Sequence, residues 1–169
     1  MRHVARYAPR APHLHVPAMT PELAELAAHY DAMPPVRALE VRPRAWDGER
    51  LQVHAPLAAN VNDKACAFGG SLAGVMTLAG WGLLTLKARA AGLVAEVYVA
   101  DSQLRYLAPL YDDLEAEASL APGQDWDAIE AQFRARGKAR VEVEAVIRRP
   151  DGASASTLQA RFALMAPKG

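Results

Sequence analysis

The chain has 169 residues, of which 51% are hydrophobic and 22% charged, and its 19 basic side chains balance 19 acidic ones. This composition excludes an intrinsically disordered chain, and the length predicts a domain able to bury its own core. A single cysteine excludes an intramolecular disulfide framework and a cysteine-built zinc site. The zero net charge argues against a general nucleic-acid binder, and no secretory signal is recognisable, so we expect a cytoplasmic protein.

Residues 1–18 are rich in proline, histidine and arginine without any period, which predicts a flexible arm ahead of a single domain at residues 19–169. His3, His13 and His15 could form a metal clip, but no further ligands accompany them, so a solvated tail and no metal site are expected.

A helix is predicted directly after the arm. Thr20 can accept a hydrogen bond from a free amide, and Pro21 suits the first helical position. Apolar residues then recur at helical spacing up to Tyr30, and the sequence Met33-Pro34-Pro35 ends the helix.

Two strands are expected next, at 36–44 and 51–57, joined by a turn at 46–49 with Asp-Gly chemistry. The second strand alternates apolar and polar residues, which is typical of a half-buried antiparallel strand. His54 lies on its polar face, where a solvated or cross-strand role is preferred over a catalytic one.

Residues 68–86 form a stretch of 19 residues without a charge. Its length would allow a membrane span, and Gly70 and Gly74 imitate a transmembrane packing motif. Alternating strands on both sides and a mean hydropathy of −0.05 favour a buried core helix instead, so no membrane span is expected. Its small residues, Gly80 among them, would let a curved sheet approach the helix closely.

Four strands and one short helix complete the prediction, with strands at 93–107, 114–120, 141–147 and 158–164 and a helix from Asp125 to Gly137. The order is helix, two strands, long helix, then four strands with a short helix among them. Such an order predicts an α+β domain, an antiparallel sheet with helices on one face.

A polar loop that begins at Asn60 leads into the pair Gly69-Gly70 at the start of the apolar helix. Free amides at a helix N-terminus attract negative charge, and glycine lets a ligand approach the backbone. Such a place can stabilise the oxyanion formed during attack on a thioester. The alternative, that the glycines only allow a tight turn, stays equally open at this point.

The strand sequence DSQLRYLAPL at 101–110, together with the Gly-Gly entry to an apolar helix, resembles hotdog-fold acyl thioesterases. Residues 60–81, NVNDKACAFGGSLAGVMTLAGW, more specifically resemble the YiiD C-terminal thioesterase family, and the likeness extends over residues 14–166. The resemblance implies a hotdog fold, an antiparallel sheet wrapped around a long central apolar helix.

The resemblance also implies site residues. Asn62 lies seven positions before Gly69, where the family's asparagine positions the attacking water or the thioester, and the Gly69 amide faces the carbonyl oxygen. Two positions depart from the wider thioesterase pattern: Phe68 replaces a histidine, and Thr77 replaces the helix acid. A hydroxyl is a poor base. Thr77 could orient water by hydrogen bonding, although a packed role is preferred in an apolar helix.

The base therefore stays open between Asp63 in the loop and Asp101 on the strand expected beside the helix. The alternatives are a surface charge for Asp63 and an ion pair, with Arg105 for example, for Asp101. Cys66 is expected to be a small packed residue. The substrate-binding candidates are Asn60, Phe68, Ser71 and Arg105.

The resemblance implies hydrolysis of acyl-CoA or acyl-carrier-protein thioesters, with coenzyme A entering as part of the substrate and no separate cofactor. Coenzyme A and acyl-carrier proteins are both negatively charged, so basic residues are expected at the entrance of the substrate site. The available basic residues are Lys64, Lys87, Arg89, Arg105 and Lys138. The missing helix acid leaves a non-catalytic acyl-thioester binder as the alternative. Because a lone sheet exposes an edge, a homodimer or a dimer of dimers is expected.

Overall fold

The computed structural model describes residues 19–168, so the predicted arm and its histidines lie outside the described residues. The helices are α1 (Pro21–Ala32), α2 (Pro34–Ala38), α3 (Leu57–Asn60), α4 (Gly69–Ala90) and α5 (Trp126–Arg136). The strands are β1 (Arg42–Trp46), β2 (Arg50–Ala55), β3 (Glu96–Tyr106), β4 (Leu114–Leu120), β5 (Lys138–Arg148) and β6 (Ser154–Met165).

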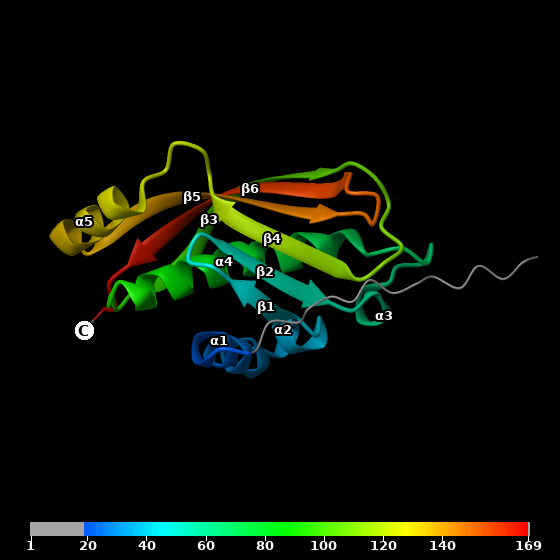
Figure 1. Cartoon of the computed structure of the whole chain (residues 1–169), viewed down its shortest axis with the longest axis horizontal. Coiled ribbons are helices and arrows are strands. Elements are labelled where there is room, and N and C mark those ends of the chain that lie inside the picture. Colours follow the sequence, from blue (N-terminus) through cyan, green and yellow to red (C-terminus); the bar gives the residue numbers. More distant parts are fainter. Residues whose placement is uncertain (1–18, 169) are drawn as a thin grey trace, which may run out of the picture.

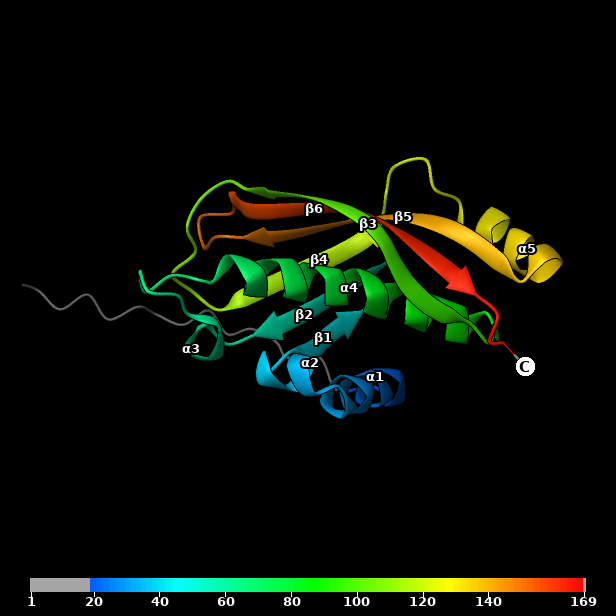
Figure 2. The ribbon, with the colours of Figure 1, turned by 180° about the vertical axis from the view of Figure 1, so that it is seen from behind.

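The six strands form one antiparallel sheet in the order β1-β2-β4-β5-β6-β3. The sheet curves around α4, which runs along its inner face (Figure 1). Seen from behind, α4 lies in front of the sheet, and α1 and α2 lie below β1 (Figure 2). This arrangement confirms the hotdog fold and the α+β class.

Alternation along the strands separates the two faces of the sheet. In β5, for example, Val141, Val143 and Ile147 are buried toward α4, while Glu142 faces outward. α4 supplies the other half of the core, and a Cβ added at Gly80 would come within 3.1 Å of Phe162 and Val143. The close approach predicted for the small residues is therefore confirmed.

α4 is the one helix of residues 19–168 that is long and apolar enough to cross a membrane by length and composition. Its C-terminal half is buried almost completely, from Ala79 to Ala88 with the exception of Trp81. The uncharged stretch is thus accounted for as the core helix of the domain.

The strand predicted at 36–44 is partly wrong. Pro34 and Pro35 occupy the first positions of α2, and β1 begins only at Arg42. The fixed φ of proline is compatible with a first helical turn, so the two prolines that end α1 also begin the next helix. The predicted cap of α1 is confirmed, since the Leu23 amide donates to the Thr20 hydroxyl at 3.4 Å.

β3 forms one edge of the sheet and pairs only with β6. Almost all of its residues are exposed, and Tyr98, Val99 and Tyr106 are each about half exposed or more. This edge presents both unpaired backbone groups and apolar side chains.

Candidate active site at the N-terminus of the central helix

The loop before α4 is held closed by one asparagine side chain. The Asn62 Oδ1 accepts hydrogen bonds from the amides of Lys64 (2.8 Å) and Cys66 (3.3 Å), and Nδ2 lies 3.3 Å from the Cys66 sulfur. The Asn62 amide donates to the Cys66 carbonyl at 2.8 Å, and Ala65 adopts a φ of 59°. Asn62 is thus at the predicted place, but its side chain is engaged within the loop. Cys66 is buried, as expected.

The first turn of α4 has free amides. Phe68 precedes the helix without a side-chain cap, and among residues 19–168 the amides of Gly69, Gly70 and Ser71 have no hydrogen-bond acceptor. These groups point outward along the helix axis at its positive end. The turn can therefore bind an anion or an oxygen that develops negative charge.

Exposed apolar side chains, called the apolar rim below, lie in the segments next to this turn: Val61, Phe68, Tyr106, Leu107 and Tyr111. The Tyr106 hydroxyl donates to the Gly69 carbonyl at 3.1 Å, and a Cβ at Gly70 would overlap the Phe68 ring. Glycine at position 70 therefore leaves room for the ring in this position beside the helix. The rim therefore combines apolar surface with free amide donors.

Three other predicted residues lie in or next to α4 and differ in accessibility. Asn60 is 2% exposed, and its Nδ2 donates to the carbonyls of Leu39 (3.0 Å) and Pro56 (2.8 Å). Ser71 is buried, and the half-buried Thr77 donates its hydroxyl to the Ala73 carbonyl at 2.8 Å. Asn60 thus anchors the loop to neighbouring elements, and Thr77 bonds within its own helix.

The two candidate bases lie in different places. Asp63 stays in the loop before α4, largely exposed and paired with Lys64 at 2.8 Å. Asp101 faces the outer side of the sheet, away from α4, where it pairs with Arg161 rather than Arg105. The hydrogen bond from Arg161 lowers the pKa of Asp101. Of the two candidate bases, only Asp63 therefore lies near Gly69 and Gly70 in the amino-acid sequence.

The basic candidates do not converge on one rim. Lys87 is 5% exposed, pairs with Glu49 at 3.0 Å and lies 5.4 Å from the centre of the Trp126 ring. It is 18 residues beyond Gly69 in α4, about 27 Å along the helix. Arg89 pairs with Glu25 near that same far end.

His54 belongs to a small charged cluster outside this site. Its Nε2 lies 3.2 Å from Asp113 and 3.9 Å from Glu115, which confirms the cross-strand role. The Leu57 amide, with His54 as a weaker partner, lowers the pKa of Asp113, while burial raises the pKa of Glu115. The cluster fastens the start of α3 to β4.

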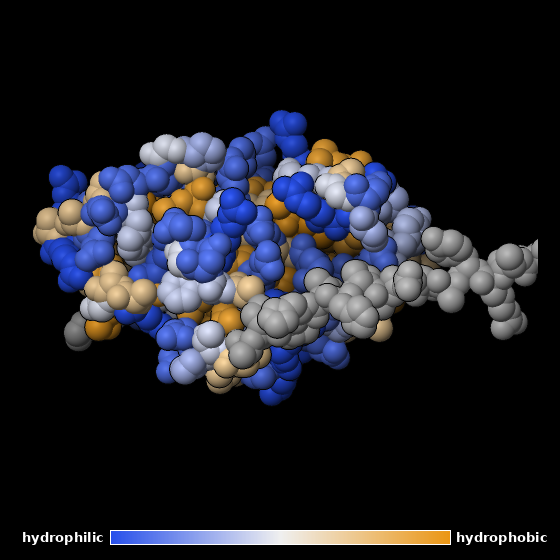
Figure 3. Space-filling model, viewed as in Figure 1, coloured by the Kyte–Doolittle hydropathy of each residue, from blue (hydrophilic) through white to orange (hydrophobic). Residues whose placement is uncertain are grey.

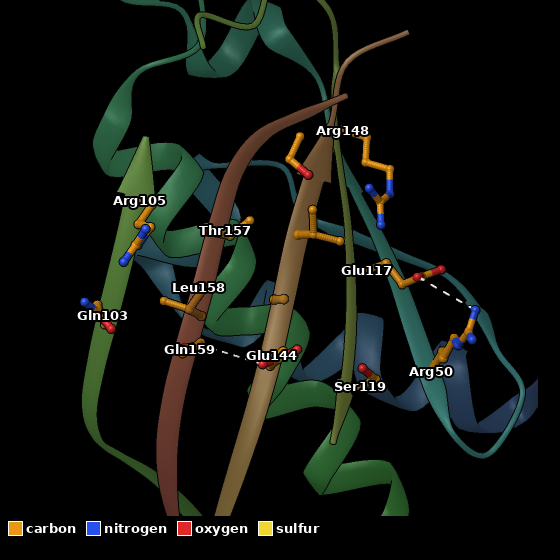
Figure 4. A pocket seen from close by; sticks show the side chains of 13 residues that line it. Arg50, Gln103, Arg105, Glu117, Ser119, Glu144, Arg148, Thr157, Leu158 and Gln159 are labelled. Atoms are coloured by element: carbon orange, nitrogen blue, oxygen red, sulfur yellow. Dashed lines mark hydrogen bonds and ion pairs between the residues drawn. The ribbon is translucent and has the colours of Figure 1, made fainter. Parts of the chain in front are cut away.

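The outer face of the sheet is mostly hydrophilic (Figure 3). It contains a polar hollow of about 620 Å³, whose lining includes Arg105 and no residue of α4 (Figure 4). Arg105 and the helix N-terminus therefore lie on opposite faces of the sheet.

Sequence reasoning missed the contact of Tyr106 with Gly69, which are 37 positions apart. No local pattern predicts such a contact, because it depends on how β3 passes the first turn of α4.

Several solved structures share this fold. A protein of unknown function from Chlorobaculum tepidum is 26% identical, with a TM-score of 0.81 over 89% of this chain and 99% of its own. A protein from Shewanella oneidensis titled a "putative thioesterase" is 26% identical, with a TM-score of 0.77 over 86% and 98%. A thioesterase from Haemophilus influenzae shares the fold at 14% identity, with a TM-score of 0.65 over 85% and 90%.

The sequence itself gives the family. Residues 23–166 match the family described as "Putative thioesterase (yiiD_Cterm)". This match includes the whole sheet, α4 and the loop that leads into it. The chain therefore belongs to the YiiD C-terminal thioesterase family.

Proposed function

We propose that the protein hydrolyses acyl thioesters at the N-terminus of α4, in the cytoplasm. The observation that carries the proposal is the set of free amides at Gly69, Gly70 and Ser71 beneath an apolar rim. A thioester has an apolar acyl chain beside a carbonyl oxygen that becomes negative when the carbonyl carbon is attacked. The rim suits the chain, and the amides suit the oxygen.

In the proposed reaction, water attacks the thioester carbonyl carbon while Asp63 accepts its proton. The amides of Gly69 and Gly70 stabilise the oxyanion, and Asn62 keeps the loop and its carboxylate in position. When the intermediate collapses, the C–S bond breaks and the leaving thiolate takes up a proton. This reaction requires no separate cofactor, because coenzyme A or the carrier protein arrives as part of the substrate.

The proposed active form is a homodimer joined along β3, or a dimer of such dimers. The unpaired edge of β3 and its exposed Tyr98 and Val99 support this pairing. The side chains of the rim are exposed to solvent in the single chain. A second copy beside β3 would lie next to Tyr106, which contacts Gly69, and would shield the thioester from bulk water.

A non-catalytic acyl-thioester binder is the second candidate. It is favoured by Thr77, which carries no carboxylate and bonds to Ala73 instead. Thr77→Asp separates the two functions, since this half-buried position, about two helical turns beyond Gly69, would then carry the missing carboxylate. If the wild-type protein is only a binder, we expect this variant to gain thioester hydrolysis; an active wild-type protein excludes the binder directly.

Substitutions in the loop test the proposed roles. Asp63→Asn removes the base and should lower kcat by about 100-fold, and Asn62→Ala should lower it at least about tenfold by releasing the loop. Asp112→Asn changes an exposed carboxylate that pairs with no side chain within residues 19–168 and serves as the matched control. Release of free thiol from acyl-CoA measures all three, with circular dichroism to confirm folding. Full activity in Asp63→Asn would remove Asp63 as the base.

A further inference from the structure

The hollow on the outer face of the sheet has an uneven distribution of charge. Among its lining residues are three arginines, Arg50, Arg105 and Arg148, and two glutamates, Glu117 and Glu144 (Figure 4). At about 620 Å³ it lies within the usual size range of small-molecule sites.

Both glutamates already have partners. Glu117 lies 4.0 Å from Arg50 and accepts a hydrogen bond from Gln52 at 3.0 Å. Glu144 accepts one from Gln159 at 3.1 Å. Arg105 and Arg148, in contrast, form no ion pair with any residue between 19 and 168. The three arginines and two glutamates give the hollow a net charge of +1, and Arg105 and Arg148 are its two arginines without a carboxylate partner among those residues.

The strand register sets the spacing of these two arginines. β6 runs between β3 and β5, with Arg105 opposite Thr157 and Arg148 opposite Ser154. The two positions are thus two strand spacings apart, about 10 Å, and offset by three residues, about another 10 Å. The hydroxyls of Ser154 and Thr157 lie on the strand between them, as additional hydrogen-bond donors. This spacing suits a ligand with two separate anionic groups better than one small anion.

We propose that this hollow binds the nucleotide end of coenzyme A, with one phosphate near Arg105 and another near Arg148. Arginine binds phosphate oxygens through two hydrogen bonds at once, and the polar lining between suits a ribose. The single phosphodiester of a carrier protein would use only one arginine. The proposal rests on the proposed hydrolase function and narrows its substrate to coenzyme A thioesters.

β3 connects this hollow with the free amides of α4. Neighbouring residues of a strand point to opposite faces, so Arg105 lines the hollow while Tyr106 reaches Gly69 on the inner side, at 3.1 Å. The hollow and the helix N-terminus are therefore on two sides of the same strand end. The pantetheine arm would pass around this end, with its thioester at Gly69.

Binding of 3′,5′-ADP, measured by calorimetry, tests the site without any turnover. Arg105→Ala and Arg148→Ala should each weaken binding about tenfold, since each removes one charge-assisted contact. Arg136→Ala, at the exposed end of α5, should leave the affinity unchanged. Equal affinity in all variants, or no binding to the wild-type protein, would overturn the site.

Kinetics then distinguish the carriers. Arg105→Ala and Arg148→Ala should raise KM for acyl-CoA at least fivefold but should not raise KM for acyl-N-acetylcysteamine, which lacks the nucleotide, whereas Arg136→Ala should leave both values of KM unchanged. A larger effect on acyl-carrier protein than on acyl-CoA would contradict the assignment to coenzyme A. Arginine-dependent binding of 3′,5′-ADP without hydrolysis of any thioester would leave the site standing and refute the hydrolase. Hydrolysis of acyl-CoA with a KM that is independent of both arginines would support the hydrolase and refute the coenzyme A site in the hollow.

Discussion

Individual polar residues near α4 divide into those that build the loop and those that stay open to a ligand. Asn60 and Asn62 both use their side chains to hold backbone groups. The open donors are backbone amides, which no side-chain pattern reveals. The sequence predicted a loop ahead of α4 because glycine and asparagine have strong local preferences there. It could not show which side chains the loop itself uses, because that depends on contacts with Leu39 and Pro56.

Asp113 gives a pH-dependent prediction at the same scale. The Leu57 amide donates to one of its oxygens at 2.8 Å, and this bond lowers its pKa in the folded state. A lowered folded-state pKa means that the carboxylate stabilises the fold above the ordinary aspartate pKa of about 4. That stability is lost as the pH falls through the lowered value.

Asp113→Asn should therefore lower Tm at pH 7, and the difference from the wild-type protein should shrink toward pH 3. Asp112→Asn, one position earlier and exposed, should leave Tm unchanged at both pH values. Thermal unfolding followed by circular dichroism measures both. A Tm difference for Asp113→Asn that grows toward acid would contradict the assigned role.

Among the elements, α4 depends on glycine where other elements cross it. A Cβ at Gly82 would overlap the Tyr30 hydroxyl and come within 2.8 Å of Leu51, both fully buried. At Gly74 the nearest atom is a flexible Leu39 methyl group at 3.3 Å. The same substitution should therefore have opposite effects at the two positions.

Gly82→Ala should lower the free energy of unfolding by about 1–3 kcal/mol through overpacking. Gly74→Ala should be neutral or stabilising by up to about 1 kcal/mol, because alanine favours the helix. Urea unfolding of both variants gives the comparison. Equal effects would mean that α1 and β2 do not pack on α4 as closely as described.

Elements with strong local signals were predicted well, and the others were not. β4 was predicted with its observed bounds, Leu114–Leu120, and α5 was predicted from its cap at Asp125 to Gly137. The strand expected from Val36 was wrong in its first half, because Pro34 and Pro35 begin α2. The location of Asp101 on the outer face depended on the pairing of β3 with β6, which alternation alone does not reveal.

For the whole molecule, the exposed edge of β3 predicts association. In light scattering coupled to size exclusion, we expect twice the chain mass of 18.2 kDa for a dimer, or four times that mass for a dimer of dimers. Tyr98→Lys places a charge on the β3 edge and should give the single-chain mass, whereas Val94→Lys, which precedes β3 and is exposed, should not. A wild-type protein of single-chain mass at low micromolar concentration would refute the dimer.

The family and the fold are shared with thioesterases, and thioester hydrolysis at the N-terminus of α4 is the function to be tested. The most direct measurement is thiol release by the wild-type protein from acyl-CoA substrates of increasing chain length, with acyl-CoA binding followed by calorimetry in parallel. We expect thiol release above the uncatalysed rate for at least one chain length, reduced at least about tenfold in Asn62→Ala. Acyl-CoA binding without thiol release at any chain length would contradict hydrolysis and identify a binder instead.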